Sequence, residues 1–183
     1  MLRKILTHGL AAGLISGLAM AVLTTVPHGH LPMAVEMALG YATMLVGLST
    51  IFLAVKRHRD TTLGGVIRFW PALFLGLGIS VVGGVIYALA WEATQALHHM
   101  DYVNDYAQAM ISQQKAKGAS DEALAALTAE MDKMKAKYAN PFYRLSMTFN
   151  EIFPVGVLVS LVSAGLLRDS RFWPARRAPA ALA

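Results

Sequence analysis

Three glutamates, Glu36, Glu92 and Glu151, lie inside long apolar stretches of the sequence. A charged side chain at the centre of a bilayer costs roughly 2.5–3.5 kcal/mol on insertion scales, so acids in such stretches are functional candidates. At 1.5 Å per residue, all three lie on the order of 5–10 Å below the same membrane boundary. If two of them meet, their like charges favour a shared proton or a bound cation.

Each glutamate also has a structural explanation. Glu36 lies near the N-terminal end of its predicted helix, where the helix dipole favours a carboxylate. Glu92 continues a stripe of small residues, so we expect it to face another helix. Glu151 lies near Pro154, which cannot donate a hydrogen bond to a preceding carbonyl. Packing and ligand binding therefore both stay open, and the nearest candidate donors are Tyr87, Trp91, Thr148 and Asn150.

Four histidines suggest a metal site, because histidine and carboxylate groups ligate zinc. His28 and His30 lie in a short connection, and His98 and His99 follow the third apolar stretch. Neither pair has the i, i+4 spacing of two ligands on one helix face. We predict that they are solvated and that the protein uses no metal and no cofactor.

Enzyme chemistry has little support in the sequence. There is no cysteine, which excludes thiolate catalysis and disulfides. No P-loop, nucleophile elbow or metalloprotease motif occurs. We therefore predict that the protein is not an enzyme.

The elements that must position these residues are membrane helices. The chain has 183 residues, of which 56% are hydrophobic and 15% charged, against about 45–50% and 25% in soluble domains. A membrane helix needs roughly 20 apolar residues, and four runs meet this length: 5–26, 33–55, 69–97 and 145–167. The predicted fold is an all-α membrane protein with four transmembrane helices, in a single domain over residues 1–168. Soluble, disordered and β-barrel proteins are excluded.

The distribution of charge predicts the topology. Ten basic residues lie in the N-terminal tail, the second connection and the C-terminal tail: Arg3, Lys4, Lys56, Arg57, Arg59, Arg68, Arg168, Arg171, Arg176 and Arg177. By the positive-inside rule, both termini and the second connection are cytoplasmic. The lipid bilayer is thus the expected partner of these charges, and nucleic acid is not.

Small residues recur at four-residue spacing in two of the predicted spans. Such spacing lets helix backbones approach closely in lipid. The first stripe is Gly9, Gly13 and Gly17, and the second is Gly76, Ser80 and Gly84. The partner of each stripe is a helix of the same chain or of a second copy.

The connection over residues 98–140 is predicted to be an extracytoplasmic helical hairpin. Gly118 interrupts an amphipathic pattern, and Ser120 is a suitable N-cap for a second helix. Asn140 and Pro141 then begin the fourth span. The residues from 169 to 183 are predicted to be a disordered, basic cytoplasmic tail.

Several of these motifs together resemble one known family. They are Gly40-Tyr41, the basic loop 56–60 with Gly64-Gly65-Val66-Ile67, Tyr87 with Trp91-Glu92, Asn140-Pro141, and the run from Thr148 to Gly156. The chain resembles an uncharacterised bacterial integral-membrane family, domain of unknown function 4199, over about residues 1–168. The resemblance implies a four-span protein of the bacterial inner membrane with a helical outer loop, and it implies no activity.

Two functional hypotheses follow. The first is a non-catalytic interaction or assembly subunit that packs through its glycine stripes and outer hairpin, as a homo-oligomer or with a membrane protein partner. The alternative is a small transport or binding protein that holds a proton, cation or polar ligand at an outer-leaflet acidic cluster. Glu→Gln substitutions would impair only the second.

Overall fold

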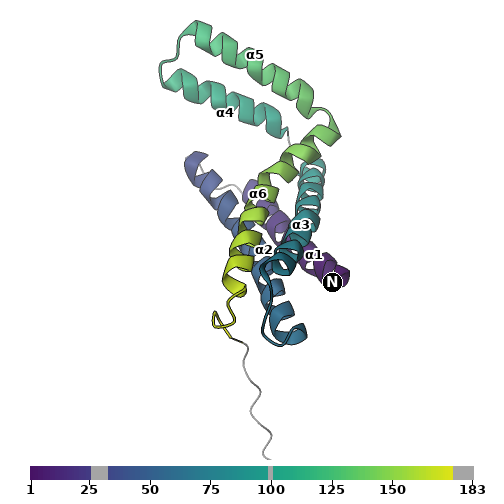
Figure 1. The fold of residues 1–183 in the computed structure, drawn as a ribbon. Coiled ribbons are helices and arrows are strands. Elements are labelled where there is room, and N and C mark those ends of the chain that lie inside the picture. Colours follow the sequence, from purple (N-terminus) through teal and green to yellow (C-terminus); the bar gives the residue numbers. More distant parts are fainter. Residues whose placement is uncertain (26–32, 99–100, 175–183) are drawn as a thin grey trace, which may run out of the picture.

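The protein is all-helical, as the hydropathy pattern predicts. The computed structural model describes residues 1–25, 33–98 and 101–174, and this part of the chain forms six helices (Figure 1). Four are long and apolar enough to cross a membrane: α1 (Leu2–Thr25), α2 (Met33–Thr62), α3 (Phe69–His98) and α6 (Pro141–Leu167). The other two, α4 (Tyr102–Ala116) and α5 (Asp121–Tyr138), form the expected pair between the third and fourth spans. The predicted fold class is confirmed.

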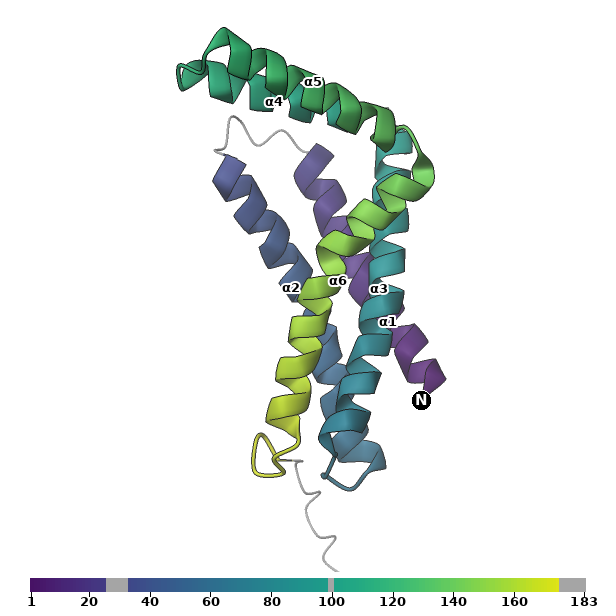
Figure 2. The ribbon, with the colours of Figure 1, turned by 45° about the horizontal axis from the view of Figure 1, so that its top comes forward.

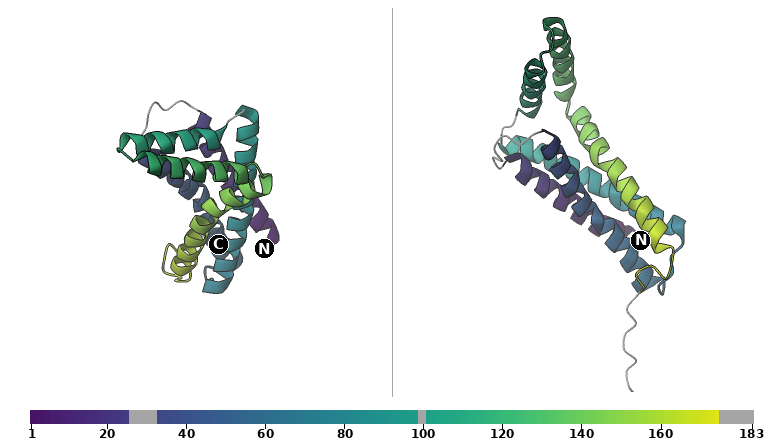
Figure 3. Two further views of the ribbon diagram at one scale, coloured as in Figure 1. Left: turned by 90° about the horizontal axis from the view of Figure 1, so that it is seen from above. Right: turned by 90° about the vertical axis from the view of Figure 1, so that its left-hand side faces the viewer.

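The six helices give the molecule two distinct ends. In a side view, the α4–α5 hairpin projects from one end of the four long helices (Figure 3). The N-terminus, the loop between α2 and α3, and the end of α6 lie at the other end (Figure 1). We call these the hairpin end and the terminal end.

Helix boundaries follow local capping more closely than they follow hydropathy. Helix α2 continues beyond the end of its apolar run at Val55 to Thr62. Helix α6 begins at Pro141, as Asn140 and Pro141 predicted, four residues before its apolar run. Asn140 caps α6, because its Oδ1 accepts a hydrogen bond of 2.9 Å from the backbone N–H of Phe142. Hydropathy marks only the apolar part of a helix. Polar side chains can continue the helix, so both helices extend beyond their apolar runs.

The turn of the hairpin has the residues that its geometry requires. Gly118 has φ of +78°, a left-handed conformation that side chains disfavour, and it ends α4. Ser120 then caps α5, because its Oγ accepts a hydrogen bond of 3.3 Å from the N–H of Ala123. The predicted break and helix start are both confirmed.

The first small-residue stripe packs within the chain, on α3. A Cβ atom at Gly13 would lie 2.5 Å from the Cβ of Ile86 and 2.6 Å from the carbonyl oxygen of Gly83. Gly9 and Gly17 contact α3 in the same way, through Val82 and Ala90, respectively. Because the glycines have no side chain, the two backbones approach each other closely.

The second stripe brings α3 and α6 together. A Cβ atom at Gly76 would lie 2.8 Å from the side chain of Ser160, and one at Gly156 would lie 2.7 Å from the Oγ of Ser80. The hydroxyls of Ser80 and Ser160 lie 3.1 Å apart and are hydrogen-bonded. Gly84 accommodates the ring of Phe149. Helix α3 is thus clamped between α1 and α6.

Helix α2 is packed at its terminal end and separated from α6 at its hairpin end. Its side chains Leu48, Ile51 and Val55 are buried, whereas Val35 and Met37 are exposed. Figure 2 shows α2 diverging from α6 toward the hairpin, and α4 and α5 crossing above the diverging ends. The four spans are therefore tightly joined at one end and open at the other.

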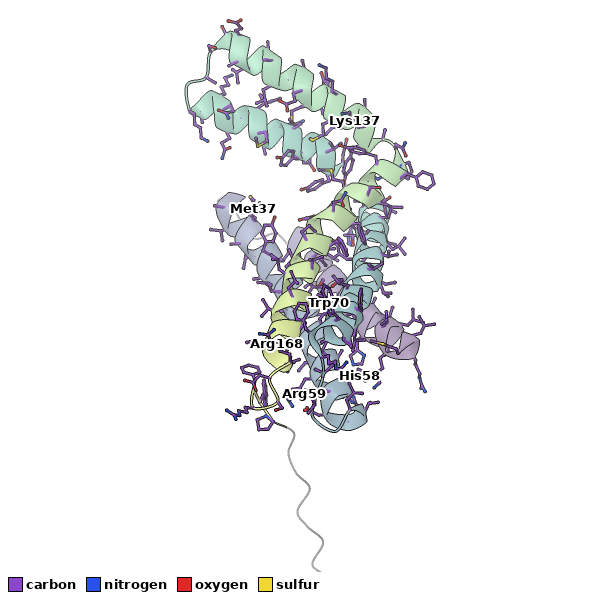
Figure 4. All side chains as sticks on the ribbon, in the orientation of Figure 1. Met37, His58, Arg59, Trp70, Lys137 and Arg168 are labelled. Atoms are coloured by element: carbon purple, nitrogen blue, oxygen red, sulfur yellow. The ribbon has the colours of Figure 1, made fainter. Side chains whose placement is uncertain are left out.

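The terminal end is held by a buried arginine. Arg59 is 0% exposed and donates hydrogen bonds to the carbonyl oxygens of Phe172 at 2.9 Å and Trp173 at 2.6 Å. Its Nε also donates to Asp60 at 2.7 Å. Figure 4 shows Arg59 close to the end of α6, where Arg168 lies. Residues 169–174, which we expected to begin a disordered tail, form a turn bonded to Arg59, and the remainder of that tail lies outside the described residues.

Candidate functional site

A cavity of about 640 Å³ lies between the four long helices and the base of the hairpin. All six helices contribute to its wall. The residues that line it are Met20, Leu23, Thr24, Glu36, Met37, Leu39, Gly40, Tyr41, Thr43, Met44, Tyr87, Trp91, Tyr102, Asp105, Tyr106, Ala109, Tyr138, Met147, Thr148 and Glu151. The cavity occupies the region where α2 diverges from α6.

Two of the three predicted glutamates share this cavity. Glu36 comes from the first turn of α2 and Glu151 from the middle of α6, so residues far apart in sequence line one space. Asp105 of α4 adds a third carboxylate. Among the described residues that line the cavity there is no lysine, arginine or histidine, and the ion pairs found in the described structure include neither Glu36 nor Glu151.

Glu92 has a different environment. Its carboxylate receives two hydrogen bonds from Arg144 of α6, 2.9 Å from Nε to Oε1 and 2.6 Å from Nη2 to Oε2. The Nη1 of Arg144 donates to the backbone carbonyl of Tyr138 at 3.2 Å. Glu92 is not among the residues that line the cavity, so it does not join the other two acids. Its arginine partner joins α3, α6 and the end of α5.

Aromatic side chains form the base of the hairpin and part of the cavity wall. The indole N–H of Trp91 donates a hydrogen bond of 2.9 Å to the hydroxyl of Tyr138. The rings of Trp91 and Tyr102 meet edge to face, with centroids 4.9 Å apart. Tyr106 stacks on Tyr102 with centroids 6.3 Å apart. The two contacts of Trp91 attach α4 and α5 to the hairpin end of α3.

The packing of Tyr102 changes its acidity. Burial of the phenol raises the pKa of Tyr102 to about 12, and the negative charge of Glu151 across the cavity acts in the same direction. Burial also raises the pKa of Tyr138. Both hydroxyls therefore stay protonated at any physiological pH and can donate a hydrogen bond.

Two side chains of the wall are buried and carry a hydroxyl group. Tyr87 is 2% exposed and Thr148 is 7% exposed, and both line the cavity. Neither hydroxyl is hydrogen-bonded to another of the described residues. Both hydroxyls are therefore available to hydrogen-bond a molecule inside the cavity.

The chain matches the model of a known protein family. Residues 9–169 match the model of the family described as "Protein of unknown function (DUF4199)". The chain belongs to this family. The resemblance seen in the sequence is confirmed, and the description of the family assigns no activity to its members. Searches of curated proteins and of solved structures gave no match.

The remaining predicted donors divide between the cavity and a neighbouring groove. Tyr87, Trp91 and Thr148 line the cavity, as Glu36 and Glu151 do. Asn150 does not; it lines a separate groove of about 430 Å³ on α6, together with Tyr143, Ser146, Met147 and Glu151. Glu151 therefore borders both spaces.

The four histidines, which we predicted to be solvated and not to bind a metal, lie only partly within the described residues. His98 ends α3 and is exposed. His28, His30 and His99 lie outside the described residues. Within residues 1–25, 33–98 and 101–174, no group of three histidine, aspartate or glutamate side chains is arranged to hold a metal ion.

Arg144 and Asp105 are site residues that sequence analysis missed. Both lie in the segment 98–144, which has six basic and six acidic residues and whose individual charges we did not assign to a site. One feature of the sequence could have identified Arg144. It follows the N-cap Asn140 by four residues, so Arg144 lies on the first turn of a span. An arginine there lies at the depth of a glutamate near the end of the preceding span.

Proposed function

We propose that the protein is a non-catalytic, multi-pass membrane protein that binds a small molecule in the cavity at its hairpin end. The observation that carries this proposal is that Glu36 and Glu151, from two helices, line one cavity without an ion-pair partner among the described residues. The volume of about 640 Å³ lies within the roughly 300–1,000 Å³ of small-molecule sites. It is much larger than a proton or a bare ion requires.

The contrast with Glu92 supports this proposal. A carboxylate near the membrane is tolerated when it is paired, and Arg144 pairs with Glu92. By residue count Glu36 and Glu151 lie at a similar depth, and they are exposed and lack such a partner in the described structure. A ligand would supply the missing interactions, whereas a purely structural role would favour an internal partner.

The hypothesis of an interaction or assembly subunit stays a prediction. It would give a role to the α4–α5 hairpin, which projects beyond the four spans (Figure 3). It gives no role to the two carboxylates and the two hydroxyl-bearing side chains, Tyr87 and Thr148, that line one cavity. We therefore prefer the binding protein.

We further propose that the terminal end faces the cytoplasm of a bacterial cell and that the cavity opens on the opposite side of the inner membrane. Basic side chains gather at the terminal end: Arg3, Lys4, Arg57, Arg68, Arg168 and Arg171. Figure 4 labels His58, Arg59 and Arg168 at this end and Lys137 at the other. An excess of lysine and arginine is typical of cytoplasmic loops.

Native mass spectrometry of the gently extracted protein tests the binding role. The informative variant is Gly40→Phe, because Gly40 lines the cavity and a Cβ atom there meets nothing within 4 Å. A side chain therefore fits there without a clash at its Cβ, and we expect the added ring to occupy cavity volume. The matched control is Gly165→Phe, because Gly165 on α6 has equally open surroundings and lies outside the cavity.

We expect the wild type and Gly165→Phe to retain a small molecule at one copy per chain, and Gly40→Phe to lose it. All three should show the same oligomeric state. A wild type that carries no bound molecule, with the same co-purifying protein in all samples, would contradict the binding role and favour assembly.

A further inference from the structure

The cavity wall also indicates the chemistry of the molecule that it receives, an inference that rests on the proposed function. Charge is the first indication. Glu36, Asp105 and Glu151 carry carboxylates, and no cationic side chain is present among the described residues of the wall. This excess of negative charge, with no cationic side chain among the described residues of the wall to balance it, favours a cation.

Hydrogen bonding is the second indication. The carboxylates of the wall can only accept hydrogen bonds when ionised. The hydroxyls of Tyr87 and Thr148, which are not hydrogen-bonded to other described residues, can accept as well. No lysine, arginine or amide side chain donates into the cavity from its described lining. A ligand with several N–H donors satisfies more of these groups than one made of acceptors.

The apolar surface of the wall is the third indication. Trp91, Tyr102 and Tyr106 present aromatic rings, and an ammonium group is attracted to a ring face. The wall also includes methionines, whose flexible side chains adapt to ligands of irregular shape: Met20, Met37, Met44 and Met147. The space is too large for a metal ion and has room for an organic body beside the charge.

We propose that the cavity binds a protonated organic amine, with its ammonium group between Glu36 and Glu151 and its apolar part against the aromatic and methionine side chains. The hydroxyls of Tyr87 and Thr148 accept the remaining N–H groups. The ammonium group belongs either to a soluble amine or to the ethanolamine headgroup of a lipid. Both sources share this chemistry, and Glu151 also borders the groove on α6.

The chain offers an internal reporter for this site. Of its three tryptophans, Trp91 lines the cavity, whereas Trp70 and Trp173 do not. The double substitution Trp70→Phe and Trp173→Phe therefore leaves Trp91 as the only tryptophan. Its emission is titrated in uncharged maltoside detergent with three probes that share one phenylbutyl group: 4-phenylbutylamine, 4-phenylbutanol and 4-phenylbutyrate.

We expect the amine to bind at least tenfold more tightly than the alcohol, and the carboxylate to bind least. Glu36→Gln with Glu151→Gln should abolish this preference and leave the amine and the alcohol equal. Glu130→Gln is the matched control, because Glu130 lies on α5 outside the cavity wall. Thermal melting of each variant verifies folding, and the single Glu151→Gln variant serves if the double variant does not fold.

Competition then distinguishes the two sources of the ammonium group. Short-chain phosphatidylethanolamine should displace the amine probe from the wild type if the ligand is an aminolipid, whereas phosphatidylglycerol of the same chain length should not. If neither lipid competes, the site takes a soluble amine. Equal binding of amine and alcohol to the wild type would overturn the amine proposal while leaving a binding cavity in place. If none of the three probes binds, the amine proposal is also overturned. The binding role itself is tested separately, by whether a molecule is retained in native mass spectrometry.

Discussion

Arg144 and Glu92 form a two-point ion pair that connects α6 to α3 and, through the carbonyl of Tyr138, to the end of the hairpin. The pair is only partly exposed, with 23% of each side chain accessible. It therefore differs from the exposed pair between Lys135 and Asp132, whose nitrogen and oxygen lie 3.6 Å apart.

A double-mutant cycle of Glu92→Gln and Arg144→Gln should reveal this difference. We expect a coupling free energy of about 1–3 kcal/mol, because hydrogen bonds to charged groups contribute that much when they are shielded from water. The same cycle on Asp132 and Lys135 should give a coupling below about 1 kcal/mol. Thermal unfolding in detergent measures both, and equal coupling in the two pairs would contradict the anchoring role of Arg144.

The contact between α1 and α3 predicts a strong effect of side-chain size at Gly13. Gly13→Leu places a branched side chain where a Cβ atom already lies 2.5 Å from Ile86 and 2.6 Å from a backbone oxygen. We expect the free energy of unfolding to fall by about 1–3 kcal/mol, as it does when a packed core is overfilled. Gly165→Leu, which meets nothing within 4 Å, should unfold at nearly the wild-type temperature. Similar melting of the two variants would show that α1 does not pack on α3 through this glycine.

The hydrogen bonds of Arg59 predict that the turn after α6 depends on the guanidinium group of this residue. Arg59→Lys retains the charge but cannot donate to Asp60, Phe172 and Trp173 in the same geometry. We expect trypsin to cleave after Arg171 much faster in Arg59→Lys and Arg59→Met than in the wild type. Arg57→Met is the control, because Arg57 is exposed on the same helix. Unchanged cleavage in the Arg59 variants would refute the role of this arginine.

The acidity of Tyr102 predicts a loss of stability at high pH. Its pKa is about 12 in the folded protein, because of burial and then of Glu151, and about 10 in an unfolded chain. The unfolded chain therefore loses its proton first, so this contribution to stability is complete below pH 10 and is lost as the pH rises to about 12. Tyr102→Phe should remove this part of the pH dependence of unfolding. Glu151→Gln should lower the pKa of Tyr102 as measured by phenolate absorbance, and an unchanged pKa would place Glu151 away from the cavity.

The fold was largely predictable from the sequence because its main signals are local. Four apolar runs determine the spans, and Gly118, Ser120 and Asn140 mark the turn and helix starts of the hairpin. The small-residue stripes indicated close helix contacts, although only the structure shows that both lie within one chain. Each of these signals depends on residues within a few positions of one another.

The site was predictable only in part, because it depends on how the helices are rotated. Counting residues gives the depth of Glu36, Glu92 and Glu151 and does not give the direction in which each points. The glycine contacts set those directions, turning Glu151 toward the cavity and Glu92 toward Arg144. The structural role of Arg59 was missed for a similar reason. It lies in a basic cluster that is typical of a cytoplasmic loop, yet it is the one member of that cluster that is fully buried.

The central claim is that Glu36 and Glu151 create a negatively charged cavity that admits a cation. Because the chain has no cysteine, Gly40→Cys introduces a single thiol into the wall, and Gly165→Cys is the matched control outside it. The measurement is the rate of thiol modification by a trimethylammonium-ethyl and by a sulfonatoethyl methanethiosulfonate reagent. We predict that the cationic reagent modifies residue 40 at least tenfold faster relative to residue 165, and that Glu36→Gln with Glu151→Gln removes this preference. Equal rates for the two reagents at residue 40, or a preference that persists without both carboxylates, would contradict the account.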